Sequence, residues 1–341
     1  MGGKALSTES ARISPDEFKK LSDELLPILS HSFTKIAVIP AYTNKLDFGD
    51  MDILVSGHYK VNEEKCKLIM KAIGAAEYSL NGTCASFGKY VDGKLFQIDL
   101  VSVESGQFNF AYNYFSFNDL GNLLGRIAHK AGFKLGWQGL MRVIRDPKND
   151  ARVVGELVIT LDWKEAIEFL GYKYDSNFVP STLEEMFEFA ASSEFCNKSI
   201  YILENRNHQA RTRDRKRKSY SEFLKWLETS QIPAFDWSNK VEIRKEFLDK
   251  AFIKWPEFKK DYDKTMSEFD EVQKSKEVFN GTLVNKITGL SGNDLGVFIE
   301  SFKNSHGFVK EKAIEFARFV NSKTKEELGT MIWTLHNHHK S

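Results

Sequence analysis

Three aspartates carry the strongest chemical signal in this sequence. Asp50 and Asp52 stand one residue apart in the apolar run 48–55, and Asp99 lies inside a second apolar run, 96–101. A strand alternates its faces with a period of two, so Asp50 and Asp52 project to the same side. Carboxylates gathered without a cation repel one another, and oxygen ligands of this kind suit Mg²⁺ or Mn²⁺. We therefore expect a divalent-cation site that handles the phosphates of a nucleotide.

A simpler explanation exists for any one of these acids. Acidic residues often end strands or lie in turns, as Asp47, Asp50 and Asp92 each could. An isolated Asp-x-Asp pair is therefore weak evidence for a site. The third aspartate, inside its own apolar run after a predicted hairpin, favours a shared site over three unrelated turn residues.

The pattern Gly49-Asp50-x-Asp52, followed by Asp99 between hydrophobic residues, resembles the catalytic signature of the DNA polymerase beta-like nucleotidyltransferase superfamily. The superfamily includes family X DNA polymerases, poly(A) and CCA-adding enzymes and small-molecule adenylyltransferases. The resemblance implies a two-metal Mg²⁺ (or Mn²⁺) site in which Asp50 and Asp52 bind both ions and Asp99 binds one. In such a site one ion lowers the pKa of the attacking hydroxyl, and the other steadies the leaving pyrophosphate.

The sequence departs from the superfamily just before the acidic pair. A Gly-Ser pair usually opens a helix there that receives the triphosphate, but residues 39–47 read Ile-Pro-Ala-Tyr-Thr-Asn-Lys-Leu-Asp. Either other groups, such as Lys45 and the hydroxyl of Thr43, contact the phosphates, or nucleotide binding is altered. Lys45 and Gly49 are our candidate nucleotide-binding residues in this segment.

A second candidate surface lies on a helix predicted within residues 117–133, which an Asn-Asp pair opens and Gly132 ends. Asp119, Asn122 and Arg126 fall at i, i+3 and i+7, so one helical face presents all three. This helix resembles the thumb helix of family X polymerases, which turns Asp, Asn and Arg toward the nascent base pair. The resemblance implies contact with the incoming nucleotide. The alternative is that Asp119 only caps the helix and Arg126 is a solvated surface charge.

A strongly basic run follows in residues 206–218, where one acid, Asp214, faces seven cations. These are Arg206, Arg211, Arg213, Arg215, Lys216, Arg217 and Lys218. Too few acids are nearby in the sequence to pair with all of them. We expect the cations from Arg211 to Lys218 to bind the phosphates of a DNA or RNA acceptor. The alternative is a solvated helix face with internal salt bridges.

Composition narrows the possible locations. The formal net charge is only +1, so overall charge predicts neither nucleic acid nor membrane as a partner. No apolar run approaches the roughly 18 residues of a membrane helix, and the first residues lack the apolar core of a signal peptide. Three scattered cysteines favour a reducing cytosol. We expect a cytoplasmic protein with no membrane partner, in the host cytoplasm if the protein is viral.

The elements that position the acids are readable from local signals. Ser14, Pro15 and Glu17 form a predicted capping box at the start of a helix. Asp92-Gly93 is a favoured two-residue hairpin turn. The predicted strands are 35–40, 51–56, 85–91 and 94–101, with a further helix over 62–75. The fold class is therefore α+β: a small mixed sheet with flanking helices, a thumb-like segment and a mainly helical C-terminal region.

We expect three domains: a nucleotidyltransferase palm over residues 1–105, a thumb-like helix and hairpin over 106–160, and a helical domain with the basic run over 161–341. The palm and the limited N-terminal segment resemble phage- or giant-virus-type nucleotidyltransferases more than a cellular repair polymerase.

Three functions stay open on these grounds. The first is transfer of a nucleoside monophosphate from an NTP or dNTP to a hydroxyl, most simply at a nucleic-acid 3′ end. The second is a non-catalytic nucleic-acid-binding accessory protein on the same scaffold. The third keeps the adenylyltransferase chemistry but uses a protein or small molecule as acceptor. The sequence patterns do not distinguish DNA from RNA or tRNA.

Overall fold

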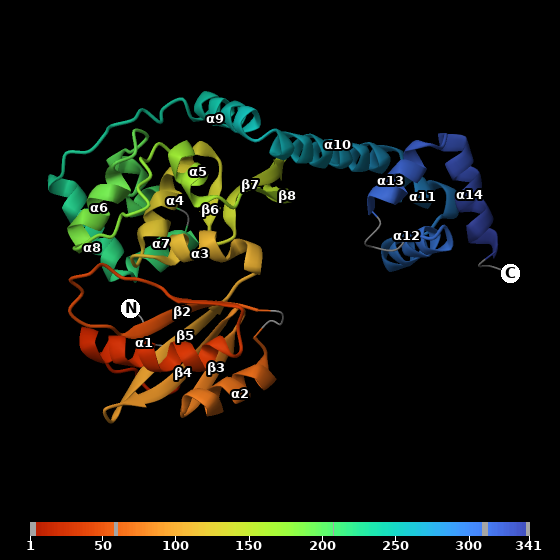
Figure 1. Cartoon of the computed structure of the whole chain (residues 1–341). Helices are drawn as coiled ribbons and strands as arrows, with labels where there is room; N and C mark the ends of the chain where they lie inside the picture. The colour runs from red at the N-terminus through yellow and green to blue at the C-terminus, as the bar shows by residue number, and fades with distance from the viewer. Residues whose placement is uncertain (1–4, 58–60, 207, 309–312, 339–341) are drawn as a thin grey trace. The chain divides into compact units, whose positions relative to one another are not determined.

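The computed structural model describes residues 5–57, 61–206, 208–308 and 313–338. The chain divides into two compact units (Figure 1). Unit 1 comprises Met1–Val143 and Glu156–Lys254, and unit 2 comprises Ile144–Gly155 and Trp255–Ser341. The predicted domain boundaries after residues 105 and 160 do not separate these units. The predicted helical domain over 161–341 is shared between both units.

Unit 1 begins with a five-stranded mixed sheet in the order β1-β2-β5-β4-β3. The strands are β1 Lys35–Val38, β2 Asp50–Ser56, β3 Glu77–Asn81, β4 Cys84–Val91 and β5 Lys94–Ser102. β2 and β5 run parallel, and the other neighbouring pairs are antiparallel. The predicted hairpin turn is confirmed, because Asp92 and Gly93 take φ values of 45° and 77°, which this turn type requires. β3 was not predicted.

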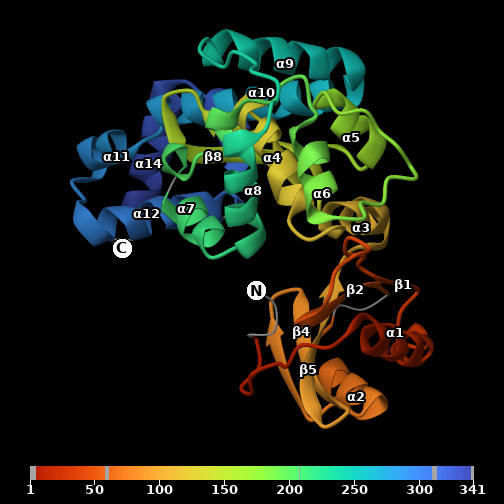
Figure 2. The same cartoon turned by 90° about the vertical axis from the view of Figure 1, so that its left-hand side faces the viewer.

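Two helices cover one face of this sheet (Figures 1 and 2). They are α1, Pro15–Ser30, which opens with the predicted capping box of Ser14 and Glu17, and α2, Glu63–Ile73. Leu25 of α1 and Ile69 of α2 are buried in one core with Ile53 of β2. On the opposite face α3, Phe108–Phe115, packs over Leu54. The sheet therefore packs against α1 and α2 on one face and against α3 on part of the other.

The rest of unit 1 is mainly helical. It contains α4 Leu120–Ala131, α5 Trp163–Phe169, α6 Leu183–Ala191, α7 His208–Arg215, α8 Lys218–Thr229 and α9 Lys240–Lys254. The predicted end of α4 is confirmed, because Gly132 takes φ 90° and its N–H bonds back into the last turn. A three-stranded sheet follows α4 in the order β6-β7-β8, from Lys134–Gly136, Gly139–Asp146 and Asn149–Thr160.

Unit 2 combines the tip of the β7–β8 hairpin with the C-terminal helices. These are α10 Pro256–Val278, α11 Gly281–Thr288, α12 Gly292–Ser305, α13 Ala313–Asn321 and α14 Lys325–His338. Phe302, Val320 and Ile332 lie in its core. Within the ranges that the structure describes, none of the helices has the length and apolar character needed to cross a membrane.

Candidate active site

The parallel ladder between β2 and β5 brings the three aspartates together. Asp52 pairs with Asp99, and Asp50 pairs with Gln97. Residues paired across a ladder point to the same face of the sheet, and so do residues two apart in one strand. Asp50, Asp52 and Asp99 therefore share one face at neighbouring positions, as the period-two pattern predicts.

The alternation of side chains along β2 explains why the acids lie on this face. Met51, Ile53 and Val55 are fully buried in the core beneath α1 and α2. The intervening positions face the other way, where Leu54 is covered by α3 but Asp52 stays exposed to solvent. The core thus fixes the strand while leaving its acidic end accessible to an ion or a substrate.

The acids raise one another's pKa. Asp52 has a pKa of about 7, raised first by the protein atoms crowded around it and then by the charges of Asp50 and Asp99. The charge of Lys45 acts in the opposite direction. Burial followed by the charge of Asp99 raises the pKa of Cys84, on β4, to about 12. Burial and like charges therefore both disfavour ionisation of Asp52, and Lys45 offsets this only in part.

Asp99 is held by two side chains that the sequence analysis did not identify. Gln97 Nε2 donates to Asp99 Oδ1 and Oδ2 at 3.0 and 2.9 Å, and the hydroxyl of Ser86 also bonds to Asp99. Burial raises the pKa of Asp99, while these hydrogen bonds lower it. Gln97 and Ser86 are thus placed to orient Asp99.

A segment before α1 ties the starts of β2 and β5 together. The hydroxyl of Ser10 accepts from the Gln97 N–H at 3.0 Å and donates to the Gly49 carbonyl at 2.9 Å. The N–H of Ala5 donates to Gln97 Oε1 at 3.0 Å. Figure 2 shows this segment, in red, leading into α1. The acids therefore sit on two strand ends that a third segment connects.

The donor set suits a hard divalent cation, although its side chains are not gathered around one. In the described ranges no group of three or more His, Cys, Asp or Glu side chains is arranged to hold a metal ion. Asp99 uses both oxygens for Gln97 instead. Three carboxylates on one face are nevertheless the ligands that Mg²⁺ and Mn²⁺ prefer, and a cation would stabilise the ionised form of Asp52, which burial and repulsion from Asp50 and Asp99 disfavour.

The segment before β2 is a loop where the superfamily would have a helix. The backbone N–H groups of Thr43 and Asn44 donate to the carbonyls of Pro180 and Ser181. Lys45 lies with Nζ 4.6 Å from the centre of the Phe48 ring. Its charge interacts with the nearby aspartates, while burial lowers its pKa. Lys45 is thus placed beside the acids.

Gly49 has a different position from Lys45. It is buried, and its carbonyl accepts the hydrogen bond from Ser10. Its observed role is to link the start of β2 to the segment before α1. No observation of the structure bears on its predicted contact with a nucleotide.

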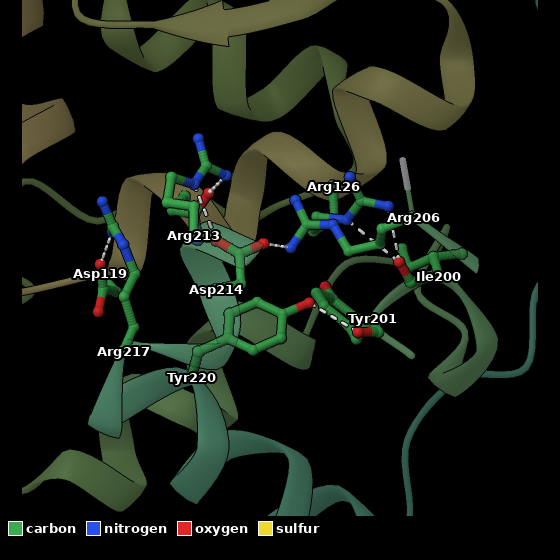
Figure 3. A network of polar contacts seen from close by, with 10 residues as sticks. Asp119, Arg126, Ile200, Tyr201, Arg206, Arg213, Asp214, Arg217 and Tyr220 are labelled. Carbon is green, nitrogen blue, oxygen red and sulfur yellow. Dashed lines mark hydrogen bonds and ion pairs between the residues drawn. The ribbon is translucent and has the colours of Figure 1, made fainter. Parts of the chain in front are cut away.

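The helix α4 does present Asp119, Asn122 and Arg126 on one side, but each bonds within the chain (Figure 3). Asp119 accepts from Arg217 and from Ser219. It stands at the N-cap position without making a cap hydrogen bond. Asn122 Oδ1 accepts from Arg213 Nη2 at 2.9 Å.

Arg126 is not a surface charge, so that alternative is wrong. Its side chain is buried, and Nε and Nη2 donate to the Ile200 carbonyl at 3.1 and 2.9 Å. Burial, followed by the charge of Arg206, lowers its pKa to about 10. A guanidinium in this position supports the packing of α4, and it does not face the carboxylates of β2 through any contact that the structure records.

The basic run is partly neutralised inside the protein. Asp214 is fully buried and pairs with both Arg206 and Arg213, the former only 3% exposed in its side chain (Figure 3). Arg206 also lies over the ring of Tyr220, whose hydroxyl donates to the Tyr201 carbonyl at 2.7 Å. We call the buried Arg206–Asp214 pair, together with Arg213 and the Arg217–Asp119 pair, the arginine network.

The remaining cations divide into paired and unpaired groups. Arg217 pairs with Asp119, and Lys218 pairs with Glu222 at 3.6 Å. The described structure records no ion pair for Arg211, Arg215 or Lys216, and the last two are exposed. Counting only the acids near the basic run in the sequence therefore underestimated the number that pair with it, because Asp119 lies 98 residues before Arg217.

Comparison with known proteins adds no family to this description. No family model matches the chain, and a search of curated proteins found no significant match. The superfamily resemblance therefore rests on the residues and motifs named above.

Proposed function

We propose that this chain is a Mg²⁺- or Mn²⁺-dependent nucleotidyltransferase, which transfers a nucleoside monophosphate from an NTP or dNTP to a hydroxyl and releases pyrophosphate. The observation that carries the proposal is the pairing of Asp52 with Asp99 in the β2–β5 ladder, with Asp50 two residues before Asp52. The raised pKa of Asp52 supports it, because burial and the charges of Asp50 and Asp99 disfavour an ionised carboxylate that a bound cation would stabilise.

Asp50, Asp52 and Asp99 would hold the metal in this proposal. When bound there, a divalent ion lowers the pKa of a hydroxyl and offsets charge on the phosphates. The acceptor oxygen forms a bond to the α-phosphorus, and the bond from that phosphorus to the bridging oxygen breaks. Pyrophosphate leaves with the electron pair of that bond. Asp99 accepts the proton of the hydroxyl, and Gln97 and Ser86 keep its carboxylate in position.

A nucleic-acid 3′ end is the acceptor that the exposed cations favour. Arg215 and Lys216 lie at the end of α7 and the residue that follows it, exposed and without a recorded ion pair. Cations that have no internal acid remain available for phosphates and release counterions when they bind them. DNA and RNA satisfy this chemistry equally.

A specific observation favours a second acceptor class, a protein or small molecule. Arg206, Arg213 and Arg217 are bound to Asp214 and Asp119, so they contribute less to a surface for a polymer. The basic surface is therefore smaller than the sequence run implies. The same metal chemistry would then act on a hydroxyl that needs no polyanion groove.

The test is a transfer assay with labelled nucleotides. The purified chain is incubated with Mg²⁺ or Mn²⁺, each α-labelled NTP and dNTP, and DNA, RNA and protein acceptors in separate pools. Asp99→Asn is the inactive variant, because it keeps the shape of the side chain and removes its charge. Asp92→Asn is the matched control, since Asp92 lies exposed in the β4–β5 turn with φ 45°, which Asn tolerates.

Label on an acceptor with wild type and Asp92→Asn, but not with Asp99→Asn, would support the proposal and identify both substrates. Equal transfer by Asp99→Asn would exclude the carboxylate site. Absence of transfer in every pool, together with salt-sensitive binding of nucleic acid, would support the accessory-protein function instead. Binding of Mn²⁺ followed by electron paramagnetic resonance gives a readout without turnover, and Asp99→Asn should weaken it at least about tenfold.

A further inference from the structure

A cavity of about 260 Å³ lies in unit 1, between α3, the start of α4, α5, α6 and the loop before α6. Aromatic side chains form much of its wall: Tyr112, Phe117, Trp163, Tyr174, Phe178 and Phe189. None of the assigned site residues lines it. Ligand pockets for drug-sized molecules are typically about 300–1,000 Å³, so this volume suits one ring system with little attached.

The rings around the cavity are held in place but are not fully covered. Phe178 stacks on Phe189 with ring centres 4.4 Å apart, and Phe117 meets Phe178 edge-on at 6.0 Å. All three stay partly exposed, as do Trp163 and Tyr174. Large aromatic side chains usually bury their faces. Several partly exposed aromatic side chains around one cavity therefore offer a stacking surface for a planar ligand.

The polar groups of the wall select among planar ligands. Asp175 lines the cavity, and its Oδ1 accepts one hydrogen bond from the Asn177 N–H. Ser176 and Asn113 also line it, whereas none of its lining residues is Lys, Arg or His. Lys164 lies 6.0 Å from the Tyr174 ring but is not part of the wall. A carboxylate without a cation disfavours phosphate and favours a ring that carries N–H donors.

The cavity wall is connected to the strand that carries the acids. Pro40 lines the cavity, and its carbonyl accepts from the Phe117 N–H at 2.8 Å. The preceding residue, Ile39, donates from its N–H to the Asp52 carbonyl at 2.9 Å. Phe117 has a φ of 59°, which is strained for a bulky residue, and Asn118 follows at 61°, which Asn tolerates. Strain of this kind persists where surrounding contacts fix it and is common at ligand sites.

We propose that this cavity binds a nucleobase, with aromatic faces stacking on the ring and Asp175 accepting a hydrogen bond from its N–H edge. The choice of a nucleobase over other planar rings rests on the proposed function, and the inference adds the binding of the base to it. The phosphates lie outside the cavity, because its lining residues carry no positive charge.

The test uses phosphate-free probes, so that it does not depend on a metal or on turnover. Adenosine, guanosine, cytidine and uridine are titrated into the full chain in EDTA, with saturation-transfer NMR and calorimetry as readouts. Ser176→Phe places a ring into the cavity from an exposed position and should weaken binding at least tenfold. Asp175→Asn should weaken guanosine binding more than uridine binding, because guanosine presents two adjacent donors, N1–H and its 2-amino group, whereas uridine presents one N3–H between two carbonyls.

Tyr90→Leu is the control for loss of an exposed aromatic ring, because Tyr90 lies on β4 with 60% of its surface exposed. It should bind nucleosides as wild type does. Absence of saturable binding by all four nucleosides would overturn the inference, and so would unchanged binding by Ser176→Phe. Asp99→Asn should bind nucleosides normally. A chain that binds nucleosides but transfers no label would therefore refute the proposed function alone.

Discussion

The acidic face of β2 and β5 and the arginine network beside α4 both concentrate charge of one sign, but they neutralise it differently. In the arginine network, Arg206 and Arg213 share Asp214, and Arg217 pairs with Asp119. On the acidic face, by contrast, Asp52 has like charges as neighbours and stays open to solvent. We infer that a run of like charges in a sequence indicates a binding site only where folding supplies too little counter-charge to neutralise it.

The largest effect should follow the loss of the acid in the arginine network. Asp214→Asn leaves Arg206 buried without its counter-ion, and breaking a buried pair in this way costs about 3–5 kcal/mol of unfolding free energy. Urea denaturation followed by circular dichroism measures the change. Asp249→Asn, at an exposed position on α9, should stay within about 0.5 kcal/mol of wild type. A loss below about 1 kcal/mol for Asp214→Asn would mean that the network does not stabilise the fold.

The acidic face should instead gain stability from an added cation. If Mg²⁺ or Mn²⁺ binds the folded chain only, an ion concentration 100-fold above its dissociation constant stabilises by about 2.7 kcal/mol. Thermal unfolding with and without EDTA measures the shift. Asp52→Asn should abolish most of it, whereas Asp92→Asn should retain it. Equal shifts in the two variants would place the ion elsewhere.

The acidic face should also show a smaller effect, a pH-dependent change in the free energy of unfolding that needs no metal. The pKa of Asp52 is about 7 in the folded chain against an ordinary value of 3.8, so its ionised form destabilises the fold. This cost is absent below about pH 4, grows as the pH rises toward 7 and is constant above. Asp52→Asn in EDTA should therefore stabilise the chain at pH 8 by about 1 kcal/mol, after allowance for solvent screening, and hardly at all at pH 4. A stabilisation equal at both pH values would contradict the shift.

Local signals were sufficient for the strands that carry the acids. Period-two alternation predicts the shared face of Asp50 and Asp52, and the Asp92-Gly93 turn fixes the register of β4 on β5. That register places Ser86 opposite Asp99, so this contact could have been derived from the turn. The predicted strands and the capping box of α1 are also confirmed. They were predictable because the residues that signal each of them lie close together in the sequence.

Long-range contacts were not readable from the sequence. The parallel pairing of β2 with β5 joins segments separated by two other strands and a helix. Arg217 and Asp119 lie 98 positions apart, and only the folded chain brings the start of α8 to the start of α4. α3 was missed because its start has no capping side chain. The aromatic cavity depends on loops and helices whose proximity has no local signal.

The smallest expected effect concerns the cations that the arginine network leaves unpaired. If they bind phosphates, Lys216→Gln should lower the salt dependence of single-stranded DNA or RNA binding by about one unit of log–log slope. Fluorescence anisotropy at increasing salt measures this slope. Lys225→Gln, an exposed lysine on α8 outside the basic run, is the control and should leave the slope unchanged. If both variants keep the wild-type slope, Lys216 binds no polymer. The division between neutralised and available cations would then lose its functional meaning, which favours a protein or small-molecule acceptor.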